Sequence, residues 1–312
     1  MRSFASACFI TGAHIDLAGR LAGPPILHVS NPGRFVRQPG GAGLNAASVA
    51  AALGLVSSIA GPVGDDAEAG VLKRLVARRG LGDALCPVPG EHTGTYASIM
   101  APDGTMVIGL ADLSIHEVVD ADWLARHCRE ALETADLWFV STNLTETALG
   151  ELAGQAEKRL LAAATISPAK SVRLKSVLSR LDLLFTNLAE ARALIGLDGA
   201  EPEQASGPQL AEALARAGVK AGTISAAGEP LTWWDGEAQG QLTPPPVGKI
   251  ADVNGAGDAL AGAALAALAR GQTMEQAARI GIAAAQLTLS VPEPFYEGID
   301  WPLLEEMAPQ IA

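Results

Sequence analysis

Short apolar runs alternate along the chain with longer stretches rich in Ala, Leu and Glu. An apolar run bounded by turn residues is typical of a strand buried on both faces, and strands separated by helices indicate βαβ units. We therefore predict an α/β fold with a mostly parallel central sheet. The predicted strands are residues 5–11, 57–59, 137–141, 163–167, 183–186 and 222–225.

Two regions interrupt this alternation: residues 26–37, and the pair 95–100 and 105–110. Pro102-Asp103-Gly104 joins the members of the pair and favours a hairpin turn. Pro32 and Pro39 restrict the first region to an edge or bent strand. We predict a small β-sheet from about residues 17–38 and 93–112, inserted in a single domain that spans residues 1–312. Residues 196–208 are polar, with Gly and Pro, and predict a short insertion between two helices.

Glycine turns open two of the predicted helices. The segment QPGGAGLN at 38–45 leads into a helix that ends at Gly54, and DVNGAGD at 252–258 leads into one that ends at Gly271. The first N–H groups of a helix lack partners and carry partial positive charge, so such a turn can hold a phosphoryl group. That field favours the ionised form of Asp258, which can accept the proton of a substrate hydroxyl. An ordinary first-turn acid that complements the helix dipole is the alternative.

Both turns resemble signatures of the ribokinase-like carbohydrate kinases, the PfkB family, whose motifs are GG-x-G-x-N and D-T-x-GAGD. Val253 replaces the usual Thr. The segments Thr11 to Asp16 and Asn187-Leu-Ala-Glu190 are similar to the family's sugar-binding segment and its N-x-x-E motif. The resemblance implies a three-layer α/β/α ribokinase-like fold in which the small β-sheet is a lid. It also implies an ATP-dependent kinase that transfers the γ-phosphoryl group to a sugar or nucleoside hydroxyl.

The same resemblance assigns roles to individual residues. Considered alone, Asn45 is typical of a helix cap, and Asn187 with Glu190 of an N-cap and a first-turn acid. Under the resemblance, the catalytic base is Asp258, and the anion hole is formed by Gly255, Ala256 and Gly257. The sugar site is formed by Asp16, Gly41 and Asn45, with further substrate contacts from Asp112 and Asn143. The nucleotide site is formed by Asn187, Ser225, Gly228 and Asn254, and the shell of Mg²⁺ involves Glu190 and Asn187.

A narrower resemblance, to the family members that phosphorylate pseudouridine, implies that nucleoside's 5′-hydroxyl as acceptor. Segments 30–33, 89–93 and 103–112 carry it. The chain departs from the family pattern at three further positions: Ala227 and Pro230 replace glycines of a phosphate-binding S-x-G-x-x-G loop, and Ser167 replaces an Asp that related kinases often have. Leu44 stands where the members that phosphorylate pseudouridine resemble one another in having Arg. A kinase for another sugar or nucleoside and a non-catalytic sensor on the same scaffold remain alternatives.

A third class, a dinucleotide-dependent oxidoreductase, fits the pattern G-x-G-x-x-A that begins at Gly41. The preceding segment is polar and contains Pro39, whereas that fingerprint requires a buried strand before the turn, so we reject this class.

Composition narrows the partners. The chain has 312 residues, of which 49% are apolar, and a net charge of −12, so we expect a globular enzyme for small molecules that binds neither nucleic acid nor a membrane. The three cysteines are widely separated, and neither they nor the five histidines have the spacing of a disulfide framework or a metal site. No apolar run reaches the 18 residues that indicate a transmembrane helix. We expect a cytoplasmic protein that is not exported. The open edges of the small β-sheet predict a homodimer, and K⁺ is a further ion that the resemblance suggests.

Overall fold

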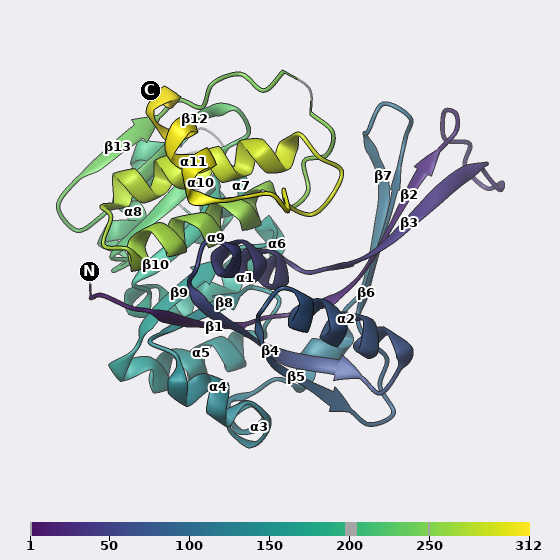
Figure 1. Cartoon of the computed structure of the whole chain (residues 1–312), viewed down its shortest axis with the longest axis horizontal. Helices are drawn as coiled ribbons and strands as arrows, with labels where there is room; N and C mark the ends of the chain where they lie inside the picture. The colour runs from purple at the N-terminus through teal and green to yellow at the C-terminus, as the bar shows by residue number, and fades with distance from the viewer. Residues whose placement is uncertain (1, 197–204, 249) are drawn as a thin grey trace.

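The computed structural model describes residues 2–196, 205–248 and 250–312, which contain one sheet of nine strands and one of four (Figure 1). The large sheet has the order β13-β12-β11-β10-β9-β8-β1-β4-β5, and only the pairs β11–β12 and β12–β13 are antiparallel. The predicted mostly parallel α/β fold is confirmed. Its strands are β1 (Ser6–Ile10), β4 (Val56–Gly64), β5 (Gly82–Val88), β8 (Leu137–Ser141), β9 (Leu160–Ala164), β10 (Leu183–Asn187), β11 (Ala221–Ala226), β12 (Glu229–Trp234) and β13 (Gln239–Leu242).

Helices cover both faces of this sheet (Figure 1), and a buried apolar cluster lies between the sheet and the helices on each face. Adjacent strand residues point to opposite faces, so Trp233 and Trp234 of β12 belong to different clusters. One face carries α1 (Ala42–Ala52), α2 (Ala67–Arg78), α9 (Ala256–Ala269), α10 (Met274–Leu289) and α11 (Trp301–Met307), and the other carries α3 (Ala121–His127), α4 (Arg129–Thr134), α5 (Glu146–Gln155), α7 (Leu188–Ile195) and α8 (Gly207–Arg216). The short α6 (Pro168–Ser171) follows β9. The result is a three-layer α/β/α architecture.

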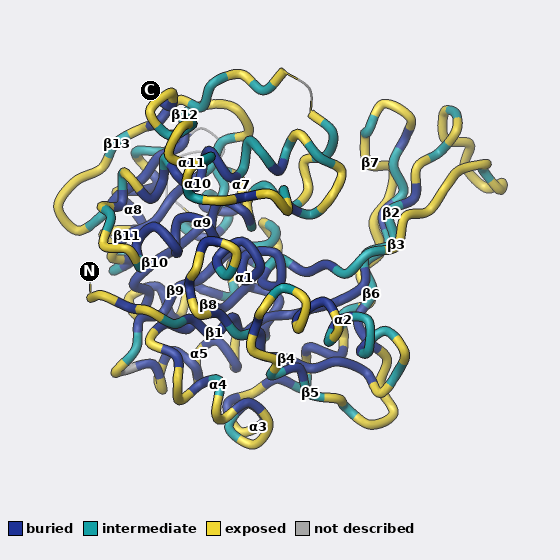
Figure 2. Tube along the Cα trace, in the orientation of Figure 1, coloured by how far each residue is buried: buried dark blue, intermediate teal, exposed yellow. Residues whose placement is uncertain are grey.

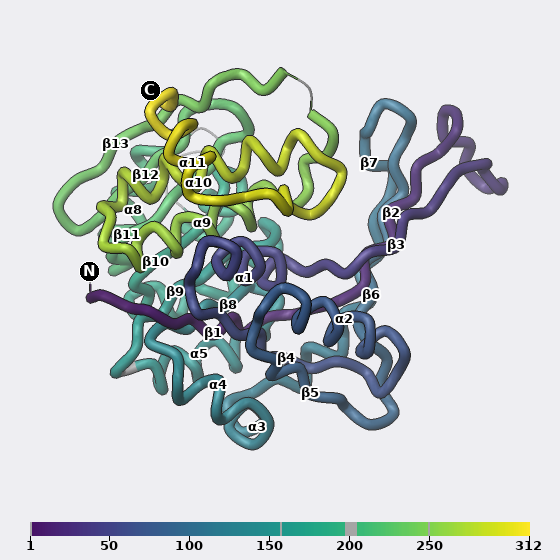
Figure 3. Tube along the Cα trace, in the orientation of Figure 1, coloured from purple at the N-terminus to yellow at the C-terminus, as the bar shows by residue number. Residues whose placement is uncertain are grey.

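The small sheet projects from the body of the molecule (Figure 3). Its order is β3-β2-β6-β7, formed by β2 (His14–Leu21), β3 (Gly33–Gly40), β6 (Thr95–Met100) and β7 (Met106–Asp112). β3 is an edge strand that contains Pro39, as its prolines predicted. The predicted turn between β6 and β7 is also present, because the Gly104 N–H donates to the Ala101 carbonyl at 3.0 Å.

Pairing across the small sheet separates its two faces. Asp16 lies opposite Gln38 and Tyr96, and Tyr96 lies opposite Ala111, so these four residues share the inner face. The alternate positions form the outer face, which carries Arg37 and the apolar side chains of Leu17, Phe35, Ala97, Ile99, Ile108 and Leu110.

Some predicted boundaries were wrong. β9 ends at Ala164, so only two residues of the predicted strand 163–167 belong to it, and Thr165 to Ser167 form a loop. Residues 22–32 form no strand, although part of that region was predicted to be one. The Leu-Leu-Ala-Ala-Ala sequence of β9 has weak strand propensity and is held extended by its parallel neighbours β8 and β10. The predicted insertion at 196–208 lies largely outside the described residues.

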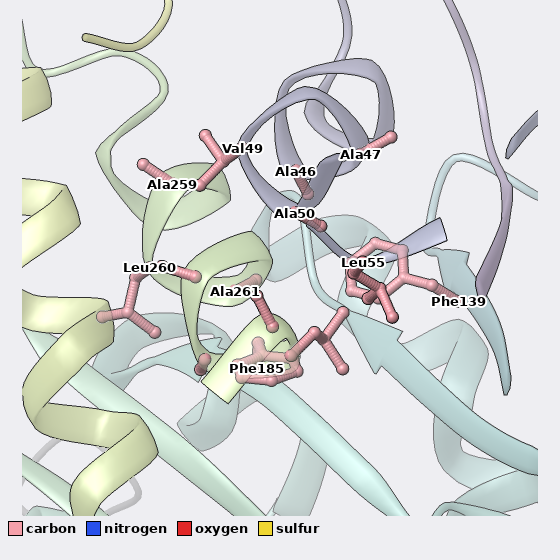
Figure 4. Close-up of a cluster of buried hydrophobic side chains, with 14 of the residues drawn as sticks. Ala46, Ala47, Val49, Ala50, Leu55, Phe139, Phe185, Ala259, Leu260 and Ala261 are labelled. Carbon is pink, nitrogen blue, oxygen red and sulfur yellow. The ribbon is translucent and has the colours of Figure 1, made fainter. Parts of the chain in front are cut away.

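Helices α1 and α9 pack against each other, which places the two glycine turns at the same end of the molecule. Figure 4 shows Ala46 and Val49 of α1 beside Ala259 and Ala261 of α9. Gly262 permits this approach, because a Cβ there would collide with the carbonyl oxygen of Ala46.

Candidate active site

A cavity of about 560 Å³ lies between the carboxyl ends of the large-sheet strands and the inner face of the small sheet. Ligands of open parallel sheets bind at this edge. The cavity brings together residues far apart in the sequence, and most of the predicted site residues line it: Asp16, Gly41, Asn45, Asn143, Asn187, Glu190, Ser225, Asn254, Gly255, Gly257 and Asp258.

Three predicted site residues do not line the cavity: Ala256, Asp112 and Gly228. Asp112 lies two residues beyond Leu110 on β7, so strand alternation places it on the outer face, while Ala111 faces the cavity. Gly228 lies in the turn between β11 and β12 and is exposed.

Asp258 and Asn45 join the two glycine turns directly. The Asn45 amide donates to Asp258 Oδ2 at 2.9 Å. Asn45 lies inside α1 and is buried, whereas the N-cap is Gly41, so the interpretation of Asn45 as a cap was wrong. The cap position instead requires glycine, because Gly41 has a φ of 116° and lies against the Gly12 carbonyl.

Burial raises the pKa of Asp258 to about 6. The Asn45 hydrogen bond and the charge of His14 oppose the rise, and the negative charges of Asp16 and Glu190 add to it. The helix field was predicted to favour the ionised carboxylate, but the largest influence on the pKa of Asp258 is desolvation, which favours the protonated form. A carboxylate with a pKa near neutrality is well matched to accepting a proton near pH 7.

The turn before α9 is built on Gly255, which caps the helix with a φ of 81°. A Cβ at Gly255 would collide with the carbonyl oxygen of Pro294, whereas a Cβ at Gly257 would meet nothing within 4 Å. Gly255 thus fixes the turn, and Gly257 leaves its surface open to the cavity. An open turn at a helix N-terminus provides N–H donors for an anion.

Asn187 and Glu190 form a capping box at the start of α7. The Glu190 N–H donates to Asn187 Oδ1 at 3.0 Å, and the Asn187 N–H donates to Glu190 Oε2 at 3.3 Å. The Thr165 hydroxyl also bonds to Glu190 Oε2. These bonds hold a buried carboxylate in the cavity wall, where it can accept from water on Mg²⁺, an ion that keeps several waters and needs few protein ligands. The described residues contain no cluster of three or more His, Cys, Asp or Glu that could hold a metal.

The altered loop after β11 is a tight turn. Ala226 pairs with Glu229, and the two residues between them, Ala227 and Gly228, have φ of 45° and 94°. Two left-handed residues between paired strands form a type I′ hairpin turn. Ser225 precedes this turn and lines the cavity. Leu44, where the family resemblance suggests Arg, is fully buried in the core and does not face the cavity.

His14 and Lys170 are among the cavity residues that sequence reasoning missed. His14 Nε2 lies 3.1 Å from Asp16 Oδ1, and the Lys170 ammonium donates to Asn143 Oδ1 at 2.8 Å. The period-two pattern of β2 could have placed His14 beside Asp16, had the strand been predicted to begin there. Lys170 gave no sequence signal that separates it from a surface lysine.

Residues 7–296 match the pfkB family of carbohydrate kinases, and the chain belongs to that family. Pseudouridine kinase from Escherichia coli strain K12 is 26% identical over 291 residues, which are 93% of this chain and 92% of that protein. A carbohydrate kinase from Agrobacterium tumefaciens superposes with a TM-score of 0.84 and 33% identity, covering 98% and 97% of the two chains. Arabidopsis thaliana ribokinase complexed with ribose and ATP gives a TM-score of 0.81 at 19% identity, covering 97% and 98%.

The protein is therefore a phosphotransferase with an alcohol group as acceptor, a sugar or nucleoside kinase with a ribokinase-like fold. Membership of this kinase family implies ATP as the donor and Mg²⁺ as its companion ion. None of the helices within the described ranges combines the length and the apolar character that crossing a membrane requires.

Proposed function

We propose that this kinase transfers the γ-phosphoryl group of ATP to the 5′-hydroxyl of pseudouridine. The observation that carries the catalytic part is the position of Asp258, which lies at the N-terminus of α9 in a cavity, is bonded to Asn45 and has its pKa raised to about 6. The similarity to pseudouridine kinase over nearly the whole chain supports the acceptor. The inner face adds Gln38, Tyr96 and Ser98, which can hydrogen-bond and stack with a polar heterocyclic base.

Each part of the cavity has a role in this proposal. Asp16, oriented by His14, binds vicinal ribose hydroxyls, and Asp258 takes the proton of the attacking hydroxyl. The open turn at Gly255 and Gly257 stabilises the charge that spreads over the phosphoryl oxygens. Glu190 and Asn187 would hold the water shell of Mg²⁺ bound with ATP, and the ion would neutralise phosphate charge there. The small sheet acts as the lid that excludes water from this cavity.

Three further features belong to the proposal. A second copy of the chain covers the outer face of the small sheet and forms a homodimer. K⁺ or a similar monovalent cation supports turnover. The protein works in the cytoplasm, which fits the free thiols of Cys8, Cys86 and Cys128.

The test is ADP release with Mg-ATP against pseudouridine, uridine, adenosine, ribose and fructose phosphates, in K⁺ and in Na⁺, with Asp258→Asn as control. We expect turnover with pseudouridine that depends on Asp258. Turnover with another acceptor alone would retain the kinase and reject the proposed substrate. Thermal stabilisation by an acceptor without turnover on any of them would favour a non-catalytic sensor, which the altered turn at Ala227 also suggests.

A further inference from the structure

The charges that line the cavity are unevenly distributed. Five carboxylates line it, whereas Lys170 is the one lysine or arginine among the described residues of its wall. The donor of the reaction is a polyanion, and like charges within a poorly hydrated site repel strongly. A single cation in such a wall is therefore the side chain best suited to contact phosphate. The carboxylates are Asp16, Glu190, Asp252, Asp258 and Glu293.

The order of strands places Lys170 between the two halves of the site. Ser225 lines the cavity from the penultimate position of β11, and Asn187 is the last residue of β10. Lys170 lies in α6, which follows β9. Asn143 follows β8, and the chain after β1 leads to Asp16. The large sheet runs β11-β10-β9-β8-β1 across this edge. The proposed nucleotide residues thus lie on one side of Lys170 and the proposed acceptor residues on the other.

The surroundings of Lys170 leave its charge uncompensated. Its ammonium donates to the neutral amide oxygen Asn143 Oδ1, and within the described part of the chain no carboxylate forms an ion pair with it. The side chain is half-buried, and burial, with a smaller contribution from Arg173, lowers the pKa of Lys170. An ammonium has three N–H donors, so two remain for an anion.

The field of Lys170 reaches the acceptor side. Burial lowers the pKa of His116 to about 3, and the charges of His14 and Lys170 add to the effect. His14 is the residue whose Nε2 lies 3.1 Å from Asp16 Oδ1. A cation in this position can act on the bond that forms between the phosphorus and the acceptor oxygen, and not only on the donor.

We propose that Lys170 is a catalytic residue whose ammonium contacts the γ-phosphoryl group while it is transferred. The bond between the γ-phosphorus and the β,γ-bridging oxygen breaks and leaves ADP, and a bond to the acceptor oxygen forms. Asp258 takes the acceptor's proton, and Lys170 keeps its own proton throughout. The contact stabilises negative charge on the phosphoryl oxygens, so its effect is on turnover. This inference rests on the proposed kinase function.

The experiment compares Lys170→Met with Lys175→Met, an exposed lysine of the same segment that does not line the cavity. Lys170→Met should lower kcat about 100-fold or more, because a donor aimed at transition-state charge is lost. The KM for the acceptor should change by less than about threefold, since that interaction is not made with the acceptor itself. Lys170→Arg should retain turnover within about tenfold of the wild type, and Lys175→Met should behave as the wild type.

A binding measurement tests the contact independently of the acceptor. Calorimetry with the imido analogue of ATP and with ADP, both with Mg²⁺, should show that Lys170→Met weakens the triphosphate analogue and leaves ADP unchanged. Equal weakening of both nucleotides, or of neither, would overturn the inference.

A rescue experiment separates the possible failures. Methylammonium added to Lys170→Ala replaces the charge without the side chain. If methylammonium restores no turnover and Lys170→Met binds the triphosphate analogue as tightly as the wild type does, Lys170 has a purely structural role. Wild-type turnover that needs Asp258 but not Lys170 rejects this inference alone, whereas turnover that does not need Asp258 rejects the proposed function.

Discussion

At the scale of single residues, the chemistry of the site depends on how Asp258 is solvated. The N-terminus of α9 favours a negative charge, but burial opposes it more strongly, and the nearby carboxylates of Asp16 and Glu190 add repulsion. The Asn45 amide is the partner that stabilises the ionised form. Neighbouring side chains should therefore adjust the pKa of Asp258 in directions that can be predicted.

The pH profile of kcat/KM should show this directly. Because Asp258 must be ionised to act as the proposed base, activity should fall as the pH drops through about 6, the pKa of Asp258. Asn45→Ala removes a hydrogen bond that lowers this pKa, so the acidic limb should move to higher pH. Asp16→Asn removes a charge that raises it, so the limb should move to lower pH. Initial rates at low acceptor concentration from pH 4.5 to 8.5 test this, and shifts in the opposite directions would contradict it.

The raised pKa also has a consequence for stability. An acid whose pKa is higher in the folded state than in the unfolded state destabilises the fold once the pH exceeds the folded value. Asp258 goes from an ordinary value of 3.8 to about 6, so its ionised form costs stability at pH 8. Asp258→Asn should therefore raise the free energy of unfolding by about 1–2 kcal/mol at pH 8, a figure reduced because the side chain is partly exposed.

Urea unfolding of the wild type and Asp258→Asn at pH 8 and at pH 4 measures this effect. The gain should disappear at pH 4, where the wild-type carboxyl is protonated in the folded state. A variant that is less stable at pH 8 than the wild type would show that the ionised carboxylate contributes to the fold.

At the scale of elements, two glycines in the turn before α9 are expected to have different roles, one in maintaining the fold and one in catalysis. Gly255 is left-handed and lies against the Pro294 carbonyl, whereas Gly257 faces open space at the cavity. Gly255→Ala should thus destabilise the fold by about 1–3 kcal/mol through strain and collision. Gly257→Ala should leave the melting temperature nearly unchanged but lower kcat, because its methyl group occupies space at the phosphoryl site.

Thermal unfolding and steady-state kinetics on the two alanine variants distinguish these effects. Gly271, a left-handed glycine after the end of α9 with open space around it, supplies the control, because Gly271→Ala should cost stability without a specific loss of turnover. Full activity in Gly257→Ala would remove this turn from the catalytic site.

The same elements show how much the sequence can predict. The glycine turns, the helices after them and the strand at β8 follow from local patterns, since turn chemistry and apolar runs are local properties. The ends of β9 and the start of β2 do not, because partner strands determine them. The pair of Asn45 and Asp258 is separated by 213 positions and depends on the packing of α1 against α9. Lys170 can be recognised as a candidate site residue only when all the charged residues of the cavity wall are known.

At the scale of the whole molecule, the small sheet has two different faces. Its inner face contributes Asp16, Gln38 and Tyr96 to the cavity. Its outer face leaves Phe35, Ile108 and Leu110 at least 63% exposed. Figure 2 shows these strands extending from the body with much of their length exposed. A contiguous apolar face of this kind on a projecting sheet is typical of an interface between subunits.

A second copy packed on the outer face would remove these side chains from water, which contributes about 1.5–3 kcal/mol for each large side chain that becomes fully buried. We therefore predict a homodimer that the double variant Ile108→Lys, Leu110→Lys converts to a monomer. Both residues lie outside the core clusters of the body, so the fold should remain intact. Val56→Lys, on an exposed valine of β4, is the matched control and should stay dimeric.

Light scattering across a range of concentrations gives the oligomeric state of each variant. If the second subunit also steadies the inner face, the monomeric variant should show a raised KM for the acceptor and an unchanged KM for ATP, because the proposal places the acceptor, and not ATP, against the small sheet. A wild type that remains monomeric at all working concentrations would contradict the dimer. A monomeric variant with unaltered kinetics would retain the interface but show that each cavity works without its neighbour.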